Sequence, residues 1–297
     1  MIKSQDPLVS KKDLSPFLDC KDYTVSRETF SLVKDNTTGL LVTSPRPSLE
    51  NLSSYYESED YISHTDSSRS LMDKVYQMIK GYSIKKKLKM INKLAVTKGH
   101  LLDIGCGTGD LLAACENDGW KIDGVEPSEK ARALASEKIA TTECLEESLE
   151  AILEKKQNKY DVITMFHVLE HVPNLTQYVD SLHQLLTEDG CLIVAVPNYK
   201  SYDADHYKQF WAAYDVPRHL WHFSQESIQH IFGAKGFHVA ETLPLIFDSF
   251  YVSMLSEKYK TGTSNLIKAF KTGLRSNIKA KRSGQYSSLI YIIKKSK

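Results

Sequence analysis

The chain has 297 residues, of which 25% are charged and 41% hydrophobic, and its formal net charge is +1. These values are typical of a globular protein and exclude collagenous and disordered chains. No segment approaches the roughly 18 consecutive apolar residues of a membrane span, and we expect no secretory signal at the start. The five cysteines are scattered without CxxC spacing, which argues against a disulfide scaffold and favours a reducing, cytoplasmic setting.

Charge is unevenly distributed along the sequence. Residues 255–297 contain 11 Lys or Arg and a single acid, so this segment carries +10 and the remainder carries −9. A basic segment on an acidic body favours anionic partners such as phosphorylated small molecules, nucleic acid or lipid headgroups; the alternative is a solvated, lysine-rich surface. Residues 256–285 contain too few aromatics for a platform that stacks single-stranded bases.

The first part of the chain has little hydrophobic periodicity. We expect residues 1–66 to form an irregular N-terminal cap, with a short hairpin and a loop within 35–48, where turn-forming residues are frequent. Helices are predicted from about 67 to 80 and from 83 to 94. Residues 67–297 then form the second predicted domain.

Strands and helices alternate through this second domain, which predicts an α/β fold. Such alternation implies β-α-β crossovers and a parallel sheet with helices on both faces. Insertions are predicted at 198–224 and at 248–285, the latter basic. The predicted strands lie at 101–104, 121–126, 142–145, 160–166, 191–197, 237–247 and 287–295. The predicted helices lie at 110–117, 128–138, 147–156, 174–187 and 224–235.

A glycine-rich turn follows the first strand of this domain. The residues are Asp103, Ile104, Gly105, Cys106, Gly107, Thr108 and Gly109. Glycines let the backbone approach a ligand closely, and a following helix presents free N–H groups. The spacing is GxGxG rather than the GxGxxG of nicotinamide sites, and a carboxylate this close would repel a pyrophosphate. A cationic ligand that carries an ammonium group is favoured instead.

Two further strand ends carry candidate ligand contacts. The second strand ends in Glu126 and Pro127, and the Glu126 carboxylate can accept hydrogen bonds from both ribose hydroxyls. The alternative is a surface glutamate in a turn. The fourth strand ends at Phe166 and His167, which we expect at the same sheet edge, where ligands bind in such folds.

These motifs together resemble the class I S-adenosylmethionine-dependent methyltransferases. The resemblance covers about residues 83–247, through LDIGCGTG, VEPS, YDVITMFHVLEHVPN and LTEDGCLIVAVPN. It implies a Rossmann-like sheet of seven strands whose last strand is antiparallel, with S-adenosylmethionine as cofactor and a small polar or anionic metabolite as acceptor. Asp103 and the Gly105–Gly109 loop would hold the cofactor's amino-acid part, Glu126 its ribose, and Cys144 and Leu145 would flank its adenine.

Histidines and carboxylates after the fourth strand are the candidate catalytic residues. Methyl transfer needs alignment and exclusion of water, and it needs a general base only where the acceptor must lose a proton. The Glu170-His171 pair resembles the pair in ubiquinone, coclaurine and cyclopropane-fatty-acid methyltransferases; alternatively, it only caps and orients the following loop. His219 lies in the insertion at 198–224, which we expect to overhang the cofactor site. Further candidate bases are His167, Asp215 and His222.

The same insertion contains an arginine with two possible roles. Arg218 can bind an acceptor carboxylate or phosphate, or it can pair with Asp215 as an internal clamp. The surrounding DVPRHLWHFS run resembles a branch of the superfamily that acts on diverse small molecules.

The N-terminal segment departs from that branch. Relatives often carry two cysteine pairs that form a small zinc ribbon, but Asp35 and Thr38 stand where the second pair would be. We therefore predict that no metal is bound. Tyr56, Tyr61 and His64 either cover the cofactor as a lid or pack a capping helix.

Two alternative functions remain open at this point. An RNA or tRNA methyltransferase would need a continuous basic surface leading to the site, with binding that falls steeply with salt. A non-catalytic module on the same fold would bind the cofactor without turnover.

Overall fold

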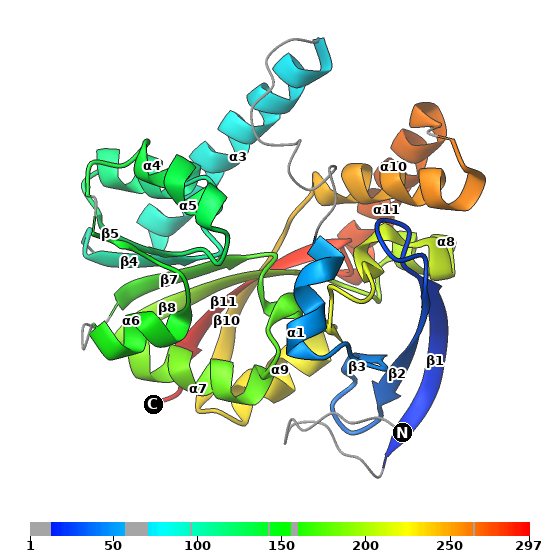
Figure 1. Ribbon diagram of the computed structural model, residues 1–297, viewed down its shortest axis with the longest axis horizontal. Coiled ribbons are helices and arrows are strands. Elements are labelled where there is room, and N and C mark those ends of the chain that lie inside the picture. Colours follow the sequence, from blue (N-terminus) through cyan, green and yellow to red (C-terminus); the bar gives the residue numbers. More distant parts are fainter. Residues whose placement is uncertain (1–12, 57–70, 96, 142, 156–159, 264) are drawn as a thin grey trace. The chain divides into compact units, whose positions relative to one another are not determined.

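A computed structural model describes residues 13–297 except 57–70, 96, 142, 156–159 and 264 (Figure 1). The chain divides into two compact units. The first unit comprises Met1–Ser58, His167–Val179 and Ala195–Ile292, and the second comprises Glu59–Phe166, Asp180–Val194 and Ile293–Lys297. Each unit is described by itself.

The larger sheet has seven strands in the order β10-β11-β8-β7-β4-β5-β6. Strand β4 pairs in parallel with β5 and β7, β5 pairs in parallel with β6, and the C-terminal strand is antiparallel. This arrangement confirms the predicted Rossmann-like α/β fold. The strands are β4 (His100–Ile104), β5 (Lys121–Val125), β6 (Leu145–Glu146), β7 (Tyr160–Phe166), β8 (Leu186–Pro197), β10 (Phe237–Pro244) and β11 (Ser288–Lys295).

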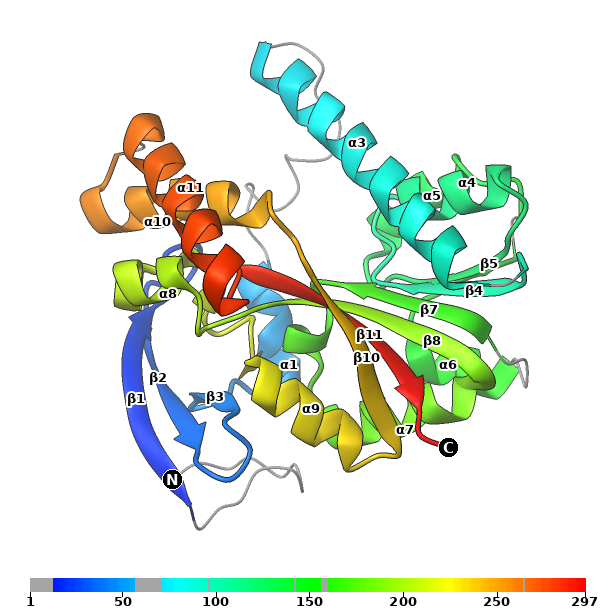
Figure 2. The ribbon, with the colours of Figure 1, turned by 180° about the vertical axis from the view of Figure 1, so that it is seen from behind.

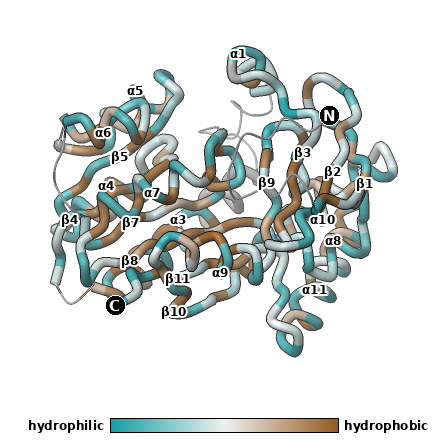
Figure 3. The backbone as a smooth tube through the Cα atoms, turned by 90° about the horizontal axis from the view of Figure 1, so that it is seen from below, coloured by the Kyte–Doolittle hydropathy of each residue, from teal (hydrophilic) through white to brown (hydrophobic). Residues whose placement is uncertain are grey.

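In the second unit, hydrophobic strands are covered by helices. The strand centres are buried, as their high hydropathy requires (Figure 3). Gly124 in β5 shows how tightly the layers approach, because an added Cβ would lie 2.6 Å from a Leu112 methyl carbon. Ser128 caps its helix by accepting a hydrogen bond from Ala131 N. The helices are α3 (Leu71–Leu94), α4 (Asp110–Asn117), α5 (Glu129–Ser136) and α6 (Leu149–Lys155).

The first unit contains a second, four-stranded antiparallel sheet in the order β1-β2-β3-β9. Its strands are β1 (Leu14–Lys21), β2 (Thr29–Asp35), β3 (Leu41–Ser44) and β9 (Trp221–His222). Aliphatic and aromatic side chains from this sheet and from the insertion at 198–224 form a common core, with Leu32, Leu41, Trp211 and Tyr214 almost fully buried. The N-terminal segment and the insertion are therefore one structural element.

Helices of very different length complete the first unit. A helical hairpin of α10 and α11 occupies one edge of this unit (Figure 2). Helix α9 begins with a capping box, in which Ser224 and Ser227 exchange side-chain and backbone hydrogen bonds. The helices are α1 (Leu49–Leu52), η1 (Ser53–Tyr56), η2 (Leu169–His171), α8 (Tyr202–Tyr207), η3 (Lys208–Phe210), η4 (Ala212–Tyr214), α9 (Gln225–Gly233), α10 (Asp248–Thr261) and α11 (Leu266–Ser283). Helix α7 (Leu175–Leu185) contributes residues to both units.

Three sequence-based element assignments were wrong. The segment predicted to be irregular forms strands β1 and β2. Burial does not alternate in β1 and alternates in β2 only over the first four residues, which is too short a run to give a clear period. The two helices predicted around residues 67–94 are one helix, because Gly81 lies in open space and is tolerated within it. Strand β8 begins at Leu186, since the turn-like residues 188–190 also pair in the sheet.

Candidate functional site

The glycine-rich turn between β4 and α4 lies in the second unit. Gly105, Gly107 and Gly109 all have positive φ angles, of 73°, 55° and 75°, which L side chains rarely adopt. At Gly109 an added Cβ would lie 2.8 Å from the Ala135 Cβ, so this glycine is needed for packing. At Gly107 nothing lies within 4 Å of the added Cβ. The backbone of Gly107 therefore faces open space, as a loop that receives a ligand requires.

Glu126 follows β5 and fastens this loop. Its Oε2 accepts a hydrogen bond from Gly107 N and its Oε1 accepts one from Ser128 N, both at 3.0 Å. Sequence reasoning expected Glu126 to face a ligand but missed that it also shapes the loop. The position of Glu126 at the end of its strand, 19 residues beyond Gly107, was the only available signal.

Asp103 is almost fully buried near the end of β4. Its Oδ1 accepts a 2.5 Å hydrogen bond from Thr164 Oγ1 of β7. Burial raises the pKa of Asp103 to about 6; the hydrogen bond from Thr164 and the charge of Lys87 act in the opposite direction. A carboxylate with this raised pKa is stabilised by any cationic group that binds beside it. Thr164 and Lys87 were not singled out in the sequence.

The remaining predicted contacts differ in their exposure. Cys144 is buried, and its thiol donates to Thr141 O, whereas Leu145 is half-buried at the start of β6. Phe166 is half-buried, and the Lys87 ammonium lies 3.6 Å from its ring centroid. Cys106 and Thr108 are buried in the loop, and Pro127 is exposed. None of these features assigns a ligand contact, so their roles stay predictions.

The first unit holds the predicted catalytic residues and also His167, which the sequence predicts as a cofactor contact and a candidate base. This residue has a φ of 60°, and its Nε2 lies 2.9 Å from Asp248 Oδ2. Burial alone would lower the pKa of His167, but the Asp248 carboxylate and then Glu170 raise it to about 10. Protonated His167 is therefore a fixed cation rather than a general base near neutral pH.

Glu170 lies in η2 and is 1% exposed. Its Oε1 is 3.4 Å from His167 Nδ1, an ion-pair distance, and neither carboxylate oxygen accepts a hydrogen bond from a described residue. Burial would raise the pKa of Glu170, but the neighbouring His167 and His219 lower it. The result is a buried, ionised carboxylate that is paired with the His167 cation and has unused acceptor capacity for hydrogen bonds.

His171 and His219 lie next to Glu170. Their rings meet edge to face with centroids 4.6 Å apart. His171 Nδ1 is 3.1 Å from Arg218 O and 2.9 Å from the Tyr56 hydroxyl, and His219 Nδ1 is 2.9 Å from Ala213 O. A carbonyl oxygen only accepts hydrogen bonds, so both Nδ1 atoms carry the proton. His171 is neutral at physiological pH because its pKa is lowered to about 4, so its Nε2 keeps a lone pair, whereas His219 Nε2 lies 3.8 Å from Asp215 Oδ2.

These three side chains form the triad of Glu170, His171 and His219, in which Glu170 and His219 are buried and His171 is half-buried. One ligand atom from each lies within 4.8 Å of the others, a spacing that a divalent cation can bridge. Burial, together with His219, lowers the pKa of His171 to about 4, so the ring is neutral at physiological pH. A neutral imidazole beside an ionised carboxylate can accept a proton from an acceptor or bind a cation.

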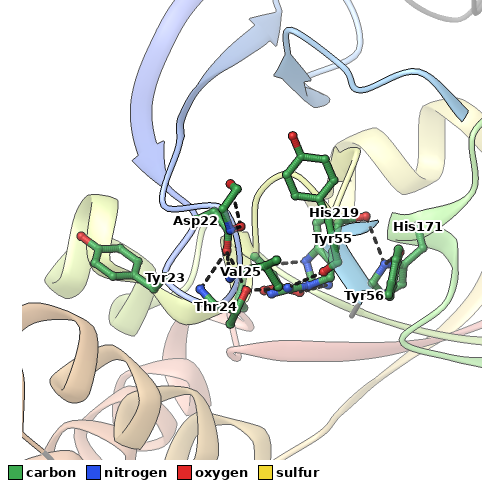
Figure 4. A network of polar contacts seen from close by, with 12 residues as sticks. Asp22, Tyr23, Thr24, Val25, Tyr55, Tyr56, His171 and His219 are labelled. Carbon is green, nitrogen blue, oxygen red and sulfur yellow. Dashed lines mark hydrogen bonds and ion pairs between the residues drawn. The ribbon is translucent and has the colours of Figure 1, made fainter. Parts of the chain in front are cut away.

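Arg218 and Asp215 form the internal clamp that was one of two sequence-based alternatives. Arg218 Nε donates to Asp215 Oδ2 at 2.9 Å, and its NH2 group donates to Asp215 Oδ1. Its NH1 also donates to Thr24 Oγ1 and Tyr55 O, so the guanidinium joins the insertion to the N-terminal segment. Thr24 and Tyr55 are labelled in Figure 4. Arg218 is 5% exposed, and its donors are used within the first unit.

The N-terminal segment keeps its hairpin at the positions of the missing cysteines. The Asp35 carboxylate accepts hydrogen bonds from Thr37 N and Thr38 N, which closes the turn between β2 and β3. Tyr56 contacts His171 directly (Figure 4), whereas Tyr61 and His64 lie outside the described residues. His222, another candidate base, has its Nε2 3.0 Å from Thr43 Oγ1.

Comparisons with known proteins agree with this fold. The model of a family described as "Methyltransferase domain" matches residues 76–242. The ubiquinone biosynthesis O-methyltransferase of Yersinia enterocolitica is 31% identical over 102 residues, which cover 33% of this chain and 42% of that protein. The corresponding protein of Salmonella paratyphi A is 34% identical over 94 residues, covering 30% and 39%. The chain thus spans less than half the length of these curated relatives.

A solved structure gives the same architecture. Magnesium protoporphyrin IX methyltransferase of Synechocystis PCC 6803, crystallised with bound SAH, superimposes with a TM-score of 0.50 and 18% identity. The match covers 78% of this chain and 91% of that one. At this identity the likeness concerns the fold.

Proposed function

Because the chain belongs to the methyltransferase-domain family, we propose that it transfers a methyl group from S-adenosylmethionine to a small polar or anionic metabolite. The acceptor atom is an oxygen, nitrogen or carbon. The observation that carries the proposal is the loop at Gly107, whose backbone is held by Glu126 beside open space.

The residues of the second unit suit this cofactor chemically. The raised pKa of Asp103 favours a ligand that brings an ammonium group to the buried carboxylate. Glu126 offers carboxylate oxygens that can accept hydrogen bonds from ribose hydroxyls. The loop N–H groups suit the carboxylate of the cofactor, and the open space at Gly107 lets the cofactor come close to the backbone. Cys144, Leu145 and Phe166 complete the proposed cofactor contacts of this unit, and His167 of the first unit stays a predicted cofactor contact. When bound, S-adenosylmethionine supplies a methyl group already activated by its sulfonium.

Residues of the first unit would handle the acceptor. The proposed roles of Glu170, His171 and His219 are to orient it and, where it must lose a proton, to accept that proton at an imidazole nitrogen. The ionised Glu170 would then stabilise the imidazolium that forms. His171 alone, with a pKa of about 4, is a weak base, so proton transfer would depend on this neighbouring charge.

Localisation and domain boundaries belong to the same proposal. We propose a cytoplasmic protein, since the five cysteines are buried free thiols. Among the described residues, no helix is long and apolar enough to cross a membrane. The domain boundary near residue 66 stays a prediction. The proposed role of the N-terminal cap is to position Tyr56 and to bind the Arg218 side chain.

A metabolite screen with isotopically labelled S-adenosylmethionine tests the proposed function. We expect label transfer to at least one small polar or anionic compound, and none in Gly107→Val. Transfer to RNA alone would favour the nucleic-acid alternative. Cofactor binding measured by calorimetry without transfer to any compound would favour the non-catalytic module.

A further inference from the structure

Helix α11 exposes its large apolar residues and buries its small ones. Four apolar residues stand four positions apart in one row, and Ile267 lies beside that row. Their exposed fractions are 53% for Leu266, 71% for Ile267, 59% for Phe270, 43% for Leu274 and 55% for Ile278. These five residues are called the α11 face. Ile267 and Ile278 lie about three turns apart on the same side of the helix.

The opposite side of α11 is fixed to the first unit by small and polar residues. Gly273 packs against α10 so closely that an added Cβ would lie 2.9 Å from Ser249 O. Ser276 Oγ donates to the buried Asp203 at 2.6 Å, and Asp203 also accepts from Trp211 Nε1 and Ser287 Oγ. Turning the helix to bury its apolar row would break this buried hydrogen-bond network.

A basic row runs alongside the α11 face. Helix α11 contains six Lys or Arg and no acid. Lys268 contacts Glu257, and Lys279 lies over the Tyr202 ring. Within the part of the chain that the structure describes, no carboxylate pairs with Lys271, Arg275, Lys281 or Arg282.

Of this row, the acids of the hairpin pair only with Lys268 among the described residues. Asp248 at the start of α10 pairs with His167, and Glu257 is fully buried and accepts a hydrogen bond from Tyr207. Two further apolar residues, Phe247 and Tyr251, are 44% and 50% exposed at the start of α10. The hairpin thus combines an exposed apolar row with an uncompensated positive charge. Soluble helices usually bury such a row.

We propose that the α11 face binds the surface of a membrane that contains anionic lipids. An amphipathic helix with Phe, Leu and Ile on one side and Lys or Arg beside them lies in the plane of the membrane interface. The apolar row would enter the boundary of headgroups and acyl chains, while Lys271, Arg275 and Arg282 approach lipid phosphates. This binding is peripheral and reversible, and it is independent of the proposed methyl transfer.

Vesicle co-sedimentation of the full chain tests the proposal. We expect binding to vesicles of phosphatidylcholine with phosphatidylglycerol, weaker binding at high salt, and little binding to phosphatidylcholine alone. Lys271→Glu with Arg275→Glu should lower the partition coefficient by at least about fivefold for each basic side chain removed. Ile267→Ser with Ile278→Ser should lower it by roughly tenfold or more, because two exposed apolar side chains no longer enter the interface.

Matched controls separate this surface from general effects. Ile79→Ser changes an isoleucine that is 44% exposed on α3, and Lys130→Glu reverses an exposed charge on α5; both should bind vesicles as the parent chain does. Thermal unfolding of every variant shows that the fold is retained.

Three outcomes would overturn the proposal. The first is equal binding to both vesicle types. The second is binding that depends on the basic residues but not on Ile267 and Ile278, as expected for a polyanion such as RNA. The third is self-association in sedimentation velocity that is lost in the isoleucine variant while vesicle binding is absent, which would assign the face to a second copy of the chain.

Discussion

The Glu126 carboxylate holds the backbone of Gly107 through a 3.0 Å hydrogen bond from Gly107 N to Glu126 Oε2. A side chain proposed to bind ribose therefore also shapes the loop proposed to receive the rest of the cofactor. Because the two roles share one carboxylate, loss of Glu126 removes a ligand contact and loosens the loop together.

Glu126→Ala should weaken S-adenosylmethionine binding by about 1–3 kcal/mol, through loss of charge-assisted hydrogen bonds. Isothermal calorimetry measures the change. Glu129→Ala is the matched control, since Glu129 is exposed in the first turn of α5. Unchanged affinity in a folded Glu126 variant would remove this residue from the ribose role.

Gly107→Val should abolish cofactor binding, because a β-branched side chain would fill the open space beside the loop. Part of the effect is backbone strain at positive φ, which Gly262→Val reproduces: Gly262 has a φ of 78° and nothing within 4 Å of an added Cβ. The control variant should therefore lose stability but keep affinity. Tight binding by the Gly107 variant would place the ligand elsewhere.

Cofactor affinity should fall as the pH is lowered through about 6, the raised pKa of Asp103. A cationic ligand prefers the ionised carboxylate, so each pH unit below this value should cost up to roughly tenfold in affinity. Asp103→Asn should bind weakly and without this pH dependence. A flat profile for the parent chain between about pH 5 and pH 7 would contradict the role of Asp103.

The same group has the opposite effect on the stability of the ligand-free chain. Its pKa in the folded state lies above the ordinary value of 3.8, so its stabilising contribution is complete below that pH. The contribution is lost as the pH rises through about 6. Chemical denaturation with and without cofactor separates the two effects.

His171→Ala and His219→Ala should leave cofactor affinity nearly unchanged and lower turnover of the true acceptor in at least one variant. The rate of methyl transfer should fall by roughly 10²–10⁴-fold if the residue acts as a base, and by less if it only orients the acceptor. Single-turnover transfer measures the effect. His230→Ala, on the exposed side of α9, is the control. Full turnover in both variants would show that these histidines have no part in the chemistry.

The expectation that no metal is bound stays a prediction. The triad of Glu170, His171 and His219 is the site at which a bound metal ion would contradict it. Metal analysis of protein purified without chelators should find less than one equivalent of zinc per chain. One equivalent that disappears in Glu170→Gln would contradict the prediction and locate the ion at the triad. One equivalent retained in that variant would place it elsewhere.

Much of the second unit was predictable from the sequence. The strand at 160–166 was predicted with its observed bounds, and the GxGxG turn and the Ser128 cap lie where local patterns indicated. These features depend on period, glycine conformation and capping, which act within a few residues. They can therefore be predicted from the sequence without knowledge of tertiary contacts.

The first unit was much less predictable. The triad combines two neighbouring residues with His219, which lies 48 positions beyond His171 in the sequence. The orientation of its two imidazoles depends on hydrogen bonds to carbonyl groups that no local pattern indicates. Strand β1 lacks a clean alternation, and it is ordered by pairing with β2. Long-range contacts of this kind leave little trace in composition or spacing.

The sequence by itself determined the alternation of strands and helices from β4 to β7, the glycine loop and the positions of the candidate acceptor carboxylates, because local backbone preferences and burial patterns encode them. Only the tertiary structure decided that Arg218 is clamped to Asp215, that His167 is a cation held by Asp248, and that α11 exposes its apolar row. Each of these depends on which distant group lies alongside, and burial and charge pairing are properties of the packed chain.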